Sequence, residues 1–147
     1  MLIRSLIYGL LGWCFEIVWT ALPTARPVDW RLKGWTYLWM LPIYGLIGPL
    51  YEPVHRLLRG AAWPLRALIY AGGFFGVEAL TGRLLIRLTG HCPWDYTGRA
   101  RWQIGGVIRL DYAPVWAGLG LALEPLHDAL VRLTPAIRAA FGAGEKD

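Results

Sequence analysis

Four long stretches of the chain are apolar enough to be membrane-spanning helices. Each has about the 20 residues that an α-helix needs to cross the hydrocarbon core of a bilayer, and charged residues are sparse within each one. Segments that contain Pro, Gly and Arg separate them, as expected where helices end at a membrane surface. We therefore predict four transmembrane helices, over residues 2–22, 34–58, 63–88 and 106–132.

The composition is that of a membrane protein rather than a soluble domain. Of the 147 residues, 56% are hydrophobic and 17% are charged, whereas a soluble domain has roughly 45–50% and 25%. Nine Trp and seven Tyr residues are typical of the belts where spans meet lipid headgroups. The two cysteines, Cys14 and Cys92, do not define a disulfide framework. We expect an all-α, multi-pass integral membrane protein of the cell inner or plasma membrane.

The net charge of +5 comes mainly from arginines near the ends of the predicted spans. This placement indicates contact with membrane lipids, and no clustered basic face points to a nucleic acid. The Lys and Arg residues divide seven against eight between the two sides of the predicted topology. The positive-inside rule therefore does not set the orientation.

The second half of the chain repeats the first half. In both halves a tyrosine is followed eight residues later by a glutamate, and a proline is followed ten residues later by a Glu-Pro-x-His sequence. Agreement at two separate places indicates an internal duplication. Each repeat holds two spans, so both repeats should cross the membrane in the same direction. We expect one transmembrane domain (residues 1–132), a four-helix bundle built from two tandem two-helix repeats (residues 1–60 and 63–132), and a short polar tail (residues 133–147).

One glutamate lies inside each predicted span. A carboxylate is costly within a membrane, so it usually faces the interior of a bundle and serves a function. Small residues precede three of the four acids on the same helix face, which allows the helices to approach closely there. We therefore expect four carboxylates to converge: Glu16, Glu52, Glu78 and Glu124.

The order of potential ligands along the chain is Glu, Glu-x-x-His, Glu, Glu-x-x-His. Positions i and i+3 share a helix face, so His55 joins Glu52 and His127 joins Glu124. This is the ligand set of di-iron and di-manganese four-helix proteins, and it suits two divalent ions of Fe, Mn or Zn. The resulting hypothesis is an oxidoreductase or hydrolase that acts on a lipid-soluble substrate. Its metal ligands would be Glu16, Glu52, His55, Glu78, Glu124 and His127.

The same acids are also consistent with a transport path. In that alternative the glutamates carry protons or a cation through a small transporter or permease subunit, and four spans per chain require a homodimer. Hydrogen bonding alone is a third interpretation. The chain lacks the GxxxxGK[ST] sequence of a phosphate-binding loop, so we expect no nucleotide cofactor.

The non-periodic stretch after residue 90 and the start of the last span supply three further polar candidates, Asp95, Tyr96 and Asp111. Asp95 is either a ligand-facing acid or the first residue of an Asx turn, and the turn is the simpler interpretation. A salt bridge with a neighbouring arginine is the simpler interpretation of Asp111.

Several motifs resemble those of a known family. They are Leu-Pro-Ile-Tyr-Gly at residues 41–45, Glu78 with Thr81-Gly82, Cys-Pro-Trp-Asp-Tyr-Thr at residues 92–97, and Gly-Val-Ile-Arg-Leu-Asp-Tyr-Ala-Pro-Val-Trp at residues 106–116. Together they are similar to the ABC-transporter type IV (CmpB-like) integral membrane family, which includes the vertebrate transmembrane protein 229 proteins. The resemblance covers residues 5–132 and implies four membrane spans. A transport activity would further imply a separate ATPase subunit.

Overall fold

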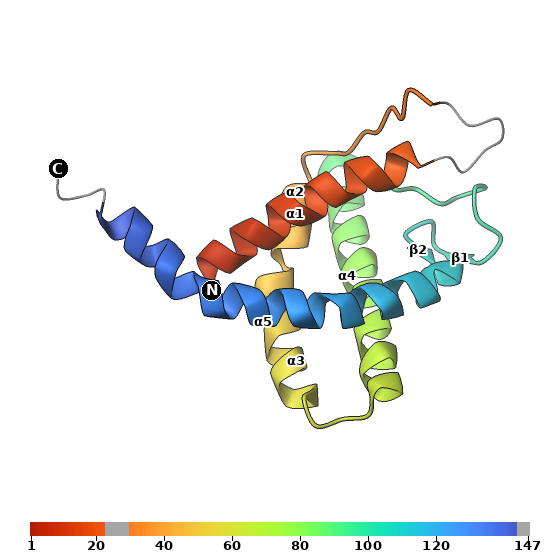
Figure 1. The fold of residues 1–147 in the computed structure, drawn as a ribbon. Coiled ribbons are helices and arrows are strands. Elements are labelled where there is room, and N and C mark those ends of the chain that lie inside the picture. Colours follow the sequence, from red (N-terminus) through yellow and green to blue (C-terminus); the bar gives the residue numbers. More distant parts are fainter. Residues whose placement is uncertain (23–29, 144–147) are drawn as a thin grey trace. The chain divides into compact units, whose positions relative to one another are not determined.

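The computed structural model describes residues 1–22 and 30–143, and it is mostly helical (Figure 1). Parts of two predicted segments, residues 23–29 of the first connector and residues 144–147 of the tail, lie outside the described residues. The helices are Leu2–Ala21 (α1), Met40–Gly45 (α2), Glu52–Leu58 (α3), Trp63–Thr89 (α4) and Ala113–Ala143 (α5), with a π-helical segment at Ile47–Tyr51 (η1) and a 3-10 turn at Leu110–Tyr112 (η2). Two short antiparallel strands, Gln103–Ile104 (β1) and Ile108–Arg109 (β2), form a hairpin.

The chain divides into two compact units. The first contains Met1–Glu52 and the residues from Thr134 onward, and the second contains Pro53–Leu133. Each unit is described by itself below.

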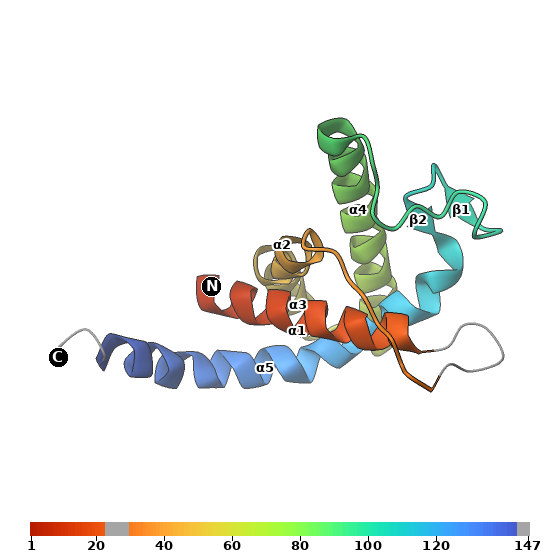
Figure 2. The ribbon, with the colours of Figure 1, turned by 90° about the horizontal axis from the view of Figure 1, so that it is seen from above.

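In the first unit, α1 lies directly against α2 and η1 (Figure 1 and Figure 2). Glycines make this close approach possible, because a Cβ atom on Gly9 would lie 2.7 Å from the carbonyl oxygen of Leu41, and one on Gly12 would overlap the ring of Tyr44. The stripe of small residues therefore faces the neighbouring helix, as membrane helix packing requires.

The second predicted span is broken rather than continuous. Residues 34–39 precede the helix, and the hydroxyl of Thr20 holds the backbone of Trp35 against α1, since it accepts the Trp35 N–H at 2.8 Å and donates to the Trp35 carbonyl at 2.6 Å. The helix begins only at Met40 and widens into a π-helix around Gly48 and Pro49. Proline has no N–H and clashes with the carbonyl four residues earlier, so Pro49 favours a local widening of the helix.

In the second unit, a short loop joins α3 to α4 (Figure 1), and α4 and α5 pack against each other. Tyr70 of α4 bonds to Glu124 of α5, and Glu78 of α4 bonds to Trp116 of α5. The two contacts lie eight residues apart on each helix and in opposite chain order, and α5 crosses α4 obliquely (Figure 1).

The polar stretch between α4 and α5 folds onto α4. Gly90 ends α4 in the left-handed conformation, with φ of 78°, which is a common helix stop. Gly105 and Gly106 turn the hairpin with φ of 59° and 72°. Val107, which is 2% exposed, packs on Gly82, where an added Cβ atom would lie 3.0 Å from its side chain.

The last helix differs at both ends from the predicted span. Residues 106–112 form the hairpin and the η2 turn, and α5 begins at Ala113 with Pro114 in its first turn, where proline is well tolerated. The helix then continues to Ala143, so residues 133–143 of the predicted tail are helical. Alanine is the best helix former, and four alanines between residues 136 and 143 favour this extension.

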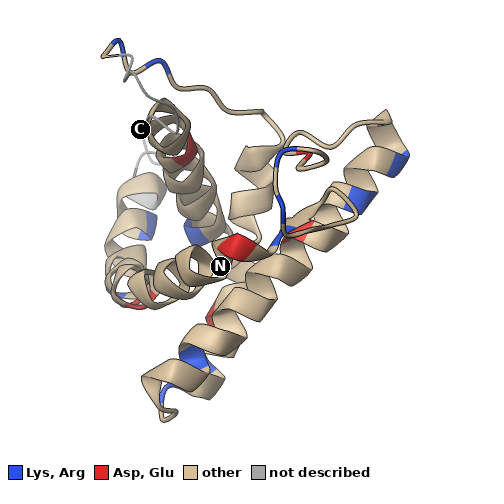
Figure 3. Ribbon diagram, turned by 90° about the vertical axis from the view of Figure 1, so that its right-hand side faces the viewer, with Lys and Arg blue, Asp and Glu red and all other residues tan. Residues whose placement is uncertain are grey.

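Among the described residues, two helices, α1 and α4, are long and apolar enough to cross a membrane. Charged positions are sparse, and most of the helical ribbon in Figure 3 is tan. Large apolar side chains are exposed on both helices, for example Leu2 at 75% on α1 and Leu68 at 70% on α4. Such exposed apolar faces are typical of contact with a membrane or with another protein.

Candidate metal centre

A group of three potential metal ligands lies in the second unit. His55 of α3 and His127 and Asp128 of α5 each offer one ligand atom, and these atoms all lie within 4.8 Å of one another. Both histidines are buried, at 4% and 3% exposure, and their ring centroids are 5.1 Å apart. Ligands at about 2.0–2.2 Å from one ion lie roughly 3–3.5 Å apart, so shifts of the order of 1 Å would bring the three atoms to a single ion. The group could therefore hold a metal ion.

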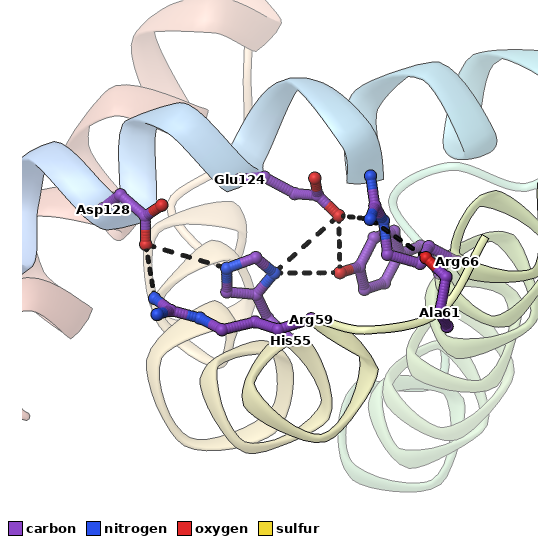
Figure 4. Close-up of polar contacts among 7 residues, drawn as sticks. His55, Arg59, Ala61, Arg66, Glu124 and Asp128 are labelled. Carbon is purple, nitrogen blue, oxygen red and sulfur yellow. Dashed lines mark hydrogen bonds and ion pairs between the residues drawn. The ribbon is translucent and has the colours of Figure 1, made fainter. Parts of the chain in front are cut away.

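His55 also belongs to a partly buried polar network (Figure 4). Its Nδ1 atom lies 3.0 Å from the hydroxyl of Tyr70, and that hydroxyl donates to Oε1 of Glu124 at 2.9 Å. Nε of Arg66 lies 2.9 Å from the same carboxylate oxygen. The predicted ligand Glu124 is thus near His55, with its negative charge paired with an arginine.

Asp128 contacts both His55 and Arg59 through one oxygen. Nη2 of Arg59 donates to Oδ1 of Asp128 at 2.7 Å, and Nε2 of His55 lies 3.8 Å from the same atom. Arg59 and Asp128 are 58% and 42% exposed, so solvent weakens this ion pair. A metal ion and Arg59 would compete for this oxygen.

Glu52 lies in the first unit and forms an ion pair with Arg4. Nε of Arg4 donates to Oε1 at 2.6 Å and Nη2 donates to Oε2 at 2.7 Å, while Nη1 donates to Thr134 at 3.3 Å. Such two-point Arg–carboxylate pairs are among the strongest hydrogen-bonded contacts in proteins. The charge of this buried carboxylate, in a residue 5% exposed, is therefore balanced within the chain.

The other two predicted ligands also have hydrogen-bond donors beside them. In the first unit, Glu16 accepts the hydroxyl of Thr36 at 3.0 Å. In the second unit, Glu78 accepts the hydroxyl of Tyr96 at 3.2 Å and the indole N–H of Trp116 at 3.3 Å. Glu78 lies eight residues beyond Tyr70, about 12 Å along α4. Glu78 and the α4 residue that Glu124 contacts therefore lie about two turns apart; convergence of the two glutamates on one centre stays a prediction.

Asp95, Tyr96 and Asp111 shape the loop that covers α4. Oδ1 of Asp95 accepts the N–H of Thr97 at 2.9 Å, as in an Asx turn, and hydrogen bonds from Thr97 hold the pKa of Asp95 below its ordinary value. Arg109 donates to both oxygens of Asp111, at 2.9 Å and 2.8 Å, and thereby lowers the pKa of Asp111. Burial raises the pKa of Tyr96, and the charge of Glu78 raises it further. The Tyr96 hydroxyl is therefore a donor to Glu78.

Comparison with known proteins places the chain in a family. Residues 5–141 match the model of the family described as "Putative ABC-transporter type IV". This chain belongs to the ABC-transporter type IV family. The match includes every candidate ligand, and it confirms the family expected from the sequence motifs. No solved structure matches the chain.

In this ABC-transporter type IV family member, the sequence alone did not reveal the arginine partners, although the repeat carries a signal for them. Arg4 and Arg66 are 62 residues apart, the same separation as Tyr8 and Tyr70. Extending the repeat alignment to these positions would have predicted two equivalent Arg–Glu pairs. Asp128 has no such signal, because Arg56 stands at the corresponding position of the first repeat.

Proposed function

We propose that this family member is an integral membrane protein that binds one divalent transition-metal ion through His55, His127 and Asp128. The single observation that carries the proposal is the clustering of two buried imidazoles and one carboxylate within 4.8 Å. Two histidines and a carboxylate form the protein ligand sets of zinc hydrolases and of non-haem Fe(II) oxygenases. Three protein ligands would leave coordination positions of the ion open, at which a substrate could bind and be polarised. The proposed activity is metal-assisted chemistry on a lipid-soluble substrate.

The charge balance of the predicted carboxylate ligands supports one ion rather than two. A carboxylate-bridged pair of ions requires about four carboxylates. Arg4 already balances Glu52, and Arg66 already balances Glu124. A second ion would have to displace an arginine from each of these carboxylates, so the di-metal form of the hypothesis is the less favoured one.

The proposal includes four membrane crossings. Besides α1 and α4, the broken helix from Met40 to Leu58 contains 19 residues and is about 28 Å long at helical rise, close to the thickness of the hydrocarbon core. The 31-residue α5 is also long enough. Pro49 in the broken helix and the acids in α5 would then face protein rather than lipid.

A transporter or permease subunit is the second candidate. The family name favours it, and so does Glu78, a carboxylate in the interior of α4 with two side-chain donors. In this case Glu78 would bind a cation or carry a proton. A homodimer and a separate ATPase subunit would be the partners.

Counting metal ions in the purified protein tests the proposal. The protein is purified in detergent without chelators, and elemental mass spectrometry measures Zn, Fe and Mn per chain. We expect about one ion in the wild type, and none in His127→Ala or Asp128→Asn. His91→Ala is the matched control, because His91 is exposed and lies outside the ligand group, and it should retain the ion.

The other outcomes separate the alternatives. Two ions per chain would favour the di-metal form. A folded wild type without metal would overturn the metal site, and flux measured in liposomes with wild type and Glu78→Gln would then test the transporter.

A further inference from the structure

Tyr70 connects the candidate metal ligand His55 to an ion pair. The tyrosine is 3% exposed, and its ring lies against the backbone of α5 at Gly120, where an added Cβ atom would overlap it. Its hydroxyl is therefore held in place between Glu124 and Nδ1 of His55 (Figure 4). A buried tyrosine with this little free space around it is a rigid hydrogen-bonding group.

The direction of each hydrogen bond follows from counting protons. Glu124 is paired with the Arg66 guanidinium at 2.9 Å, so it is a carboxylate and can only accept. The phenol has one proton, which it donates to Glu124. Its oxygen is then an acceptor for His55, and the Nδ1 atom of His55 must carry a proton.

In the neutral imidazole, a proton on Nδ1 leaves the lone pair on Nε2. Nε2 is the nitrogen that faces the ligand group, since it lies 3.8 Å from Oδ1 of Asp128. Metal-binding histidines almost always donate their other ring N–H to a neighbouring acceptor, which fixes both the tautomer and the ring orientation. His55 already has this arrangement.

We propose that Tyr70 is a positioning residue for the metal centre, which holds His55 in the tautomer that binds a metal ion through Nε2. Arg66 and Glu124 act through Tyr70, because they determine the direction in which its proton points. This inference rests on the proposed function. It gives Glu124 an indirect role, in which the carboxylate orients the Tyr70 hydroxyl and does not bind the metal ion.

Zinc titration compares two conservative variants. Tyr70→Phe removes the hydroxyl and keeps the ring, and Tyr112→Phe makes the same change at a tyrosine whose hydroxyl accepts from Arg109. We expect Tyr70→Phe to weaken Zn²⁺ binding about 10- to 100-fold and Tyr112→Phe to leave it unchanged. Equal affinities of wild type and Tyr70→Phe would overturn the inference.

A spectrum of the metal-free protein tests the tautomer without any metal. Nitrogen-15 NMR of the imidazole rings, with His55→Gln to assign the signals, should show a proton on Nδ1 and a bare Nε2 in His55. In Tyr70→Phe, the two tautomers of His55 should mix. A proton on Nε2 of His55 in the wild type would contradict the role of Tyr70. Absence of zinc binding by the wild type would instead remove the proposed function, so the two failures are distinguishable.

Discussion

The two Arg–Glu pairs stand at equivalent positions of the two repeats, yet they use their carboxylates differently. Arg4 occupies both oxygens of Glu52 with a two-point contact. The shortest contact of Arg66 is to Oε1 of Glu124, and that oxygen also accepts from Tyr70. The Arg4–Glu52 contact is a strong ion pair within the first unit. The second pair is the start of a network that reaches His55 and the candidate metal ligands. An Arg–Glu pair is thus present in both predicted repeats, and the second pair extends toward the candidate site.

The largest expected difference between the two pairs is in stability. Arg4→Ala leaves the buried Glu52 without its cation and should lower the free energy of unfolding by about 3–5 kcal/mol. Arg66→Ala should cost about 1–3 kcal/mol, because Glu124 is more exposed and retains the Tyr70 hydrogen bond. Thermal unfolding in detergent measures both. Only Arg66→Ala should also weaken zinc binding, and equal losses of stability would show that the two pairs do not differ.

Glycine substitutions in α5 test how tightly the network is packed. Gly120→Ala places a methyl group against the ring of Tyr70, so it should destabilise the protein by about 1–3 kcal/mol through overpacking and weaken zinc binding. Gly118→Ala is the matched control in the same helix, because its added Cβ atom meets no described residue within 4 Å, and it should stabilise by about 0.4–1 kcal/mol. Similar unfolding temperatures for both variants would argue against the close contact at Tyr70.

A smaller effect on zinc affinity is expected at Arg59, which lies at the solvent-exposed end of the network. Arg59→Gln releases Oδ1 of Asp128 from its ion pair, so we expect zinc to bind about two- to fivefold more tightly, in line with the small energy of exposed ion pairs. Isothermal titration measures the affinity. Weaker binding in this variant would mean that Arg59 holds Asp128 in position instead of competing with the ion.

The smallest effect concerns Asp95, which lies outside the network. Its pKa is lowered from 3.8 by hydrogen bonds from Thr97, so this contribution to stability is present above pH 3.8 and disappears as the pH falls through the lower, folded-state pKa. The amide shift of Thr97 in NMR should titrate below pH 3.8 in the wild type and stay constant in Asp95→Asn. Zinc binding should be the same in both proteins, whereas a change would connect this loop to the metal centre.

Much of the helical content could be predicted from the sequence, since long apolar runs with few charges favour helices of membrane-spanning length. The family could also be recognised, because its motifs are local. The boundaries were less predictable. The helix that begins at Met40, rather than at residue 34, depends on the hydroxyl of Thr20 binding Trp35 from another segment. Such long-range hydrogen bonds leave no trace in the local pattern of apolar residues.

The candidate site, like the helices, could be predicted only in part from the sequence. The sequence identified Glu124, His55 and His127 as candidate site residues. Ionisable residues stand out when they lie within an apolar segment, because burying them is costly. Asp128, Arg66 and the orientation of Tyr70 emerged only from the packing of α3, α4 and α5.

By itself, the sequence determined that the chain is apolar and mostly helical, and it predicted an internal duplication, since these properties follow from residue type and spacing. The tertiary structure decided which donor each carboxylate meets, including the arginines beside Glu52 and Glu124. That choice depends on distances of 2.6–2.9 Å between residues 48 and 58 positions apart, and only the packing of helices against one another can establish contacts over such separations.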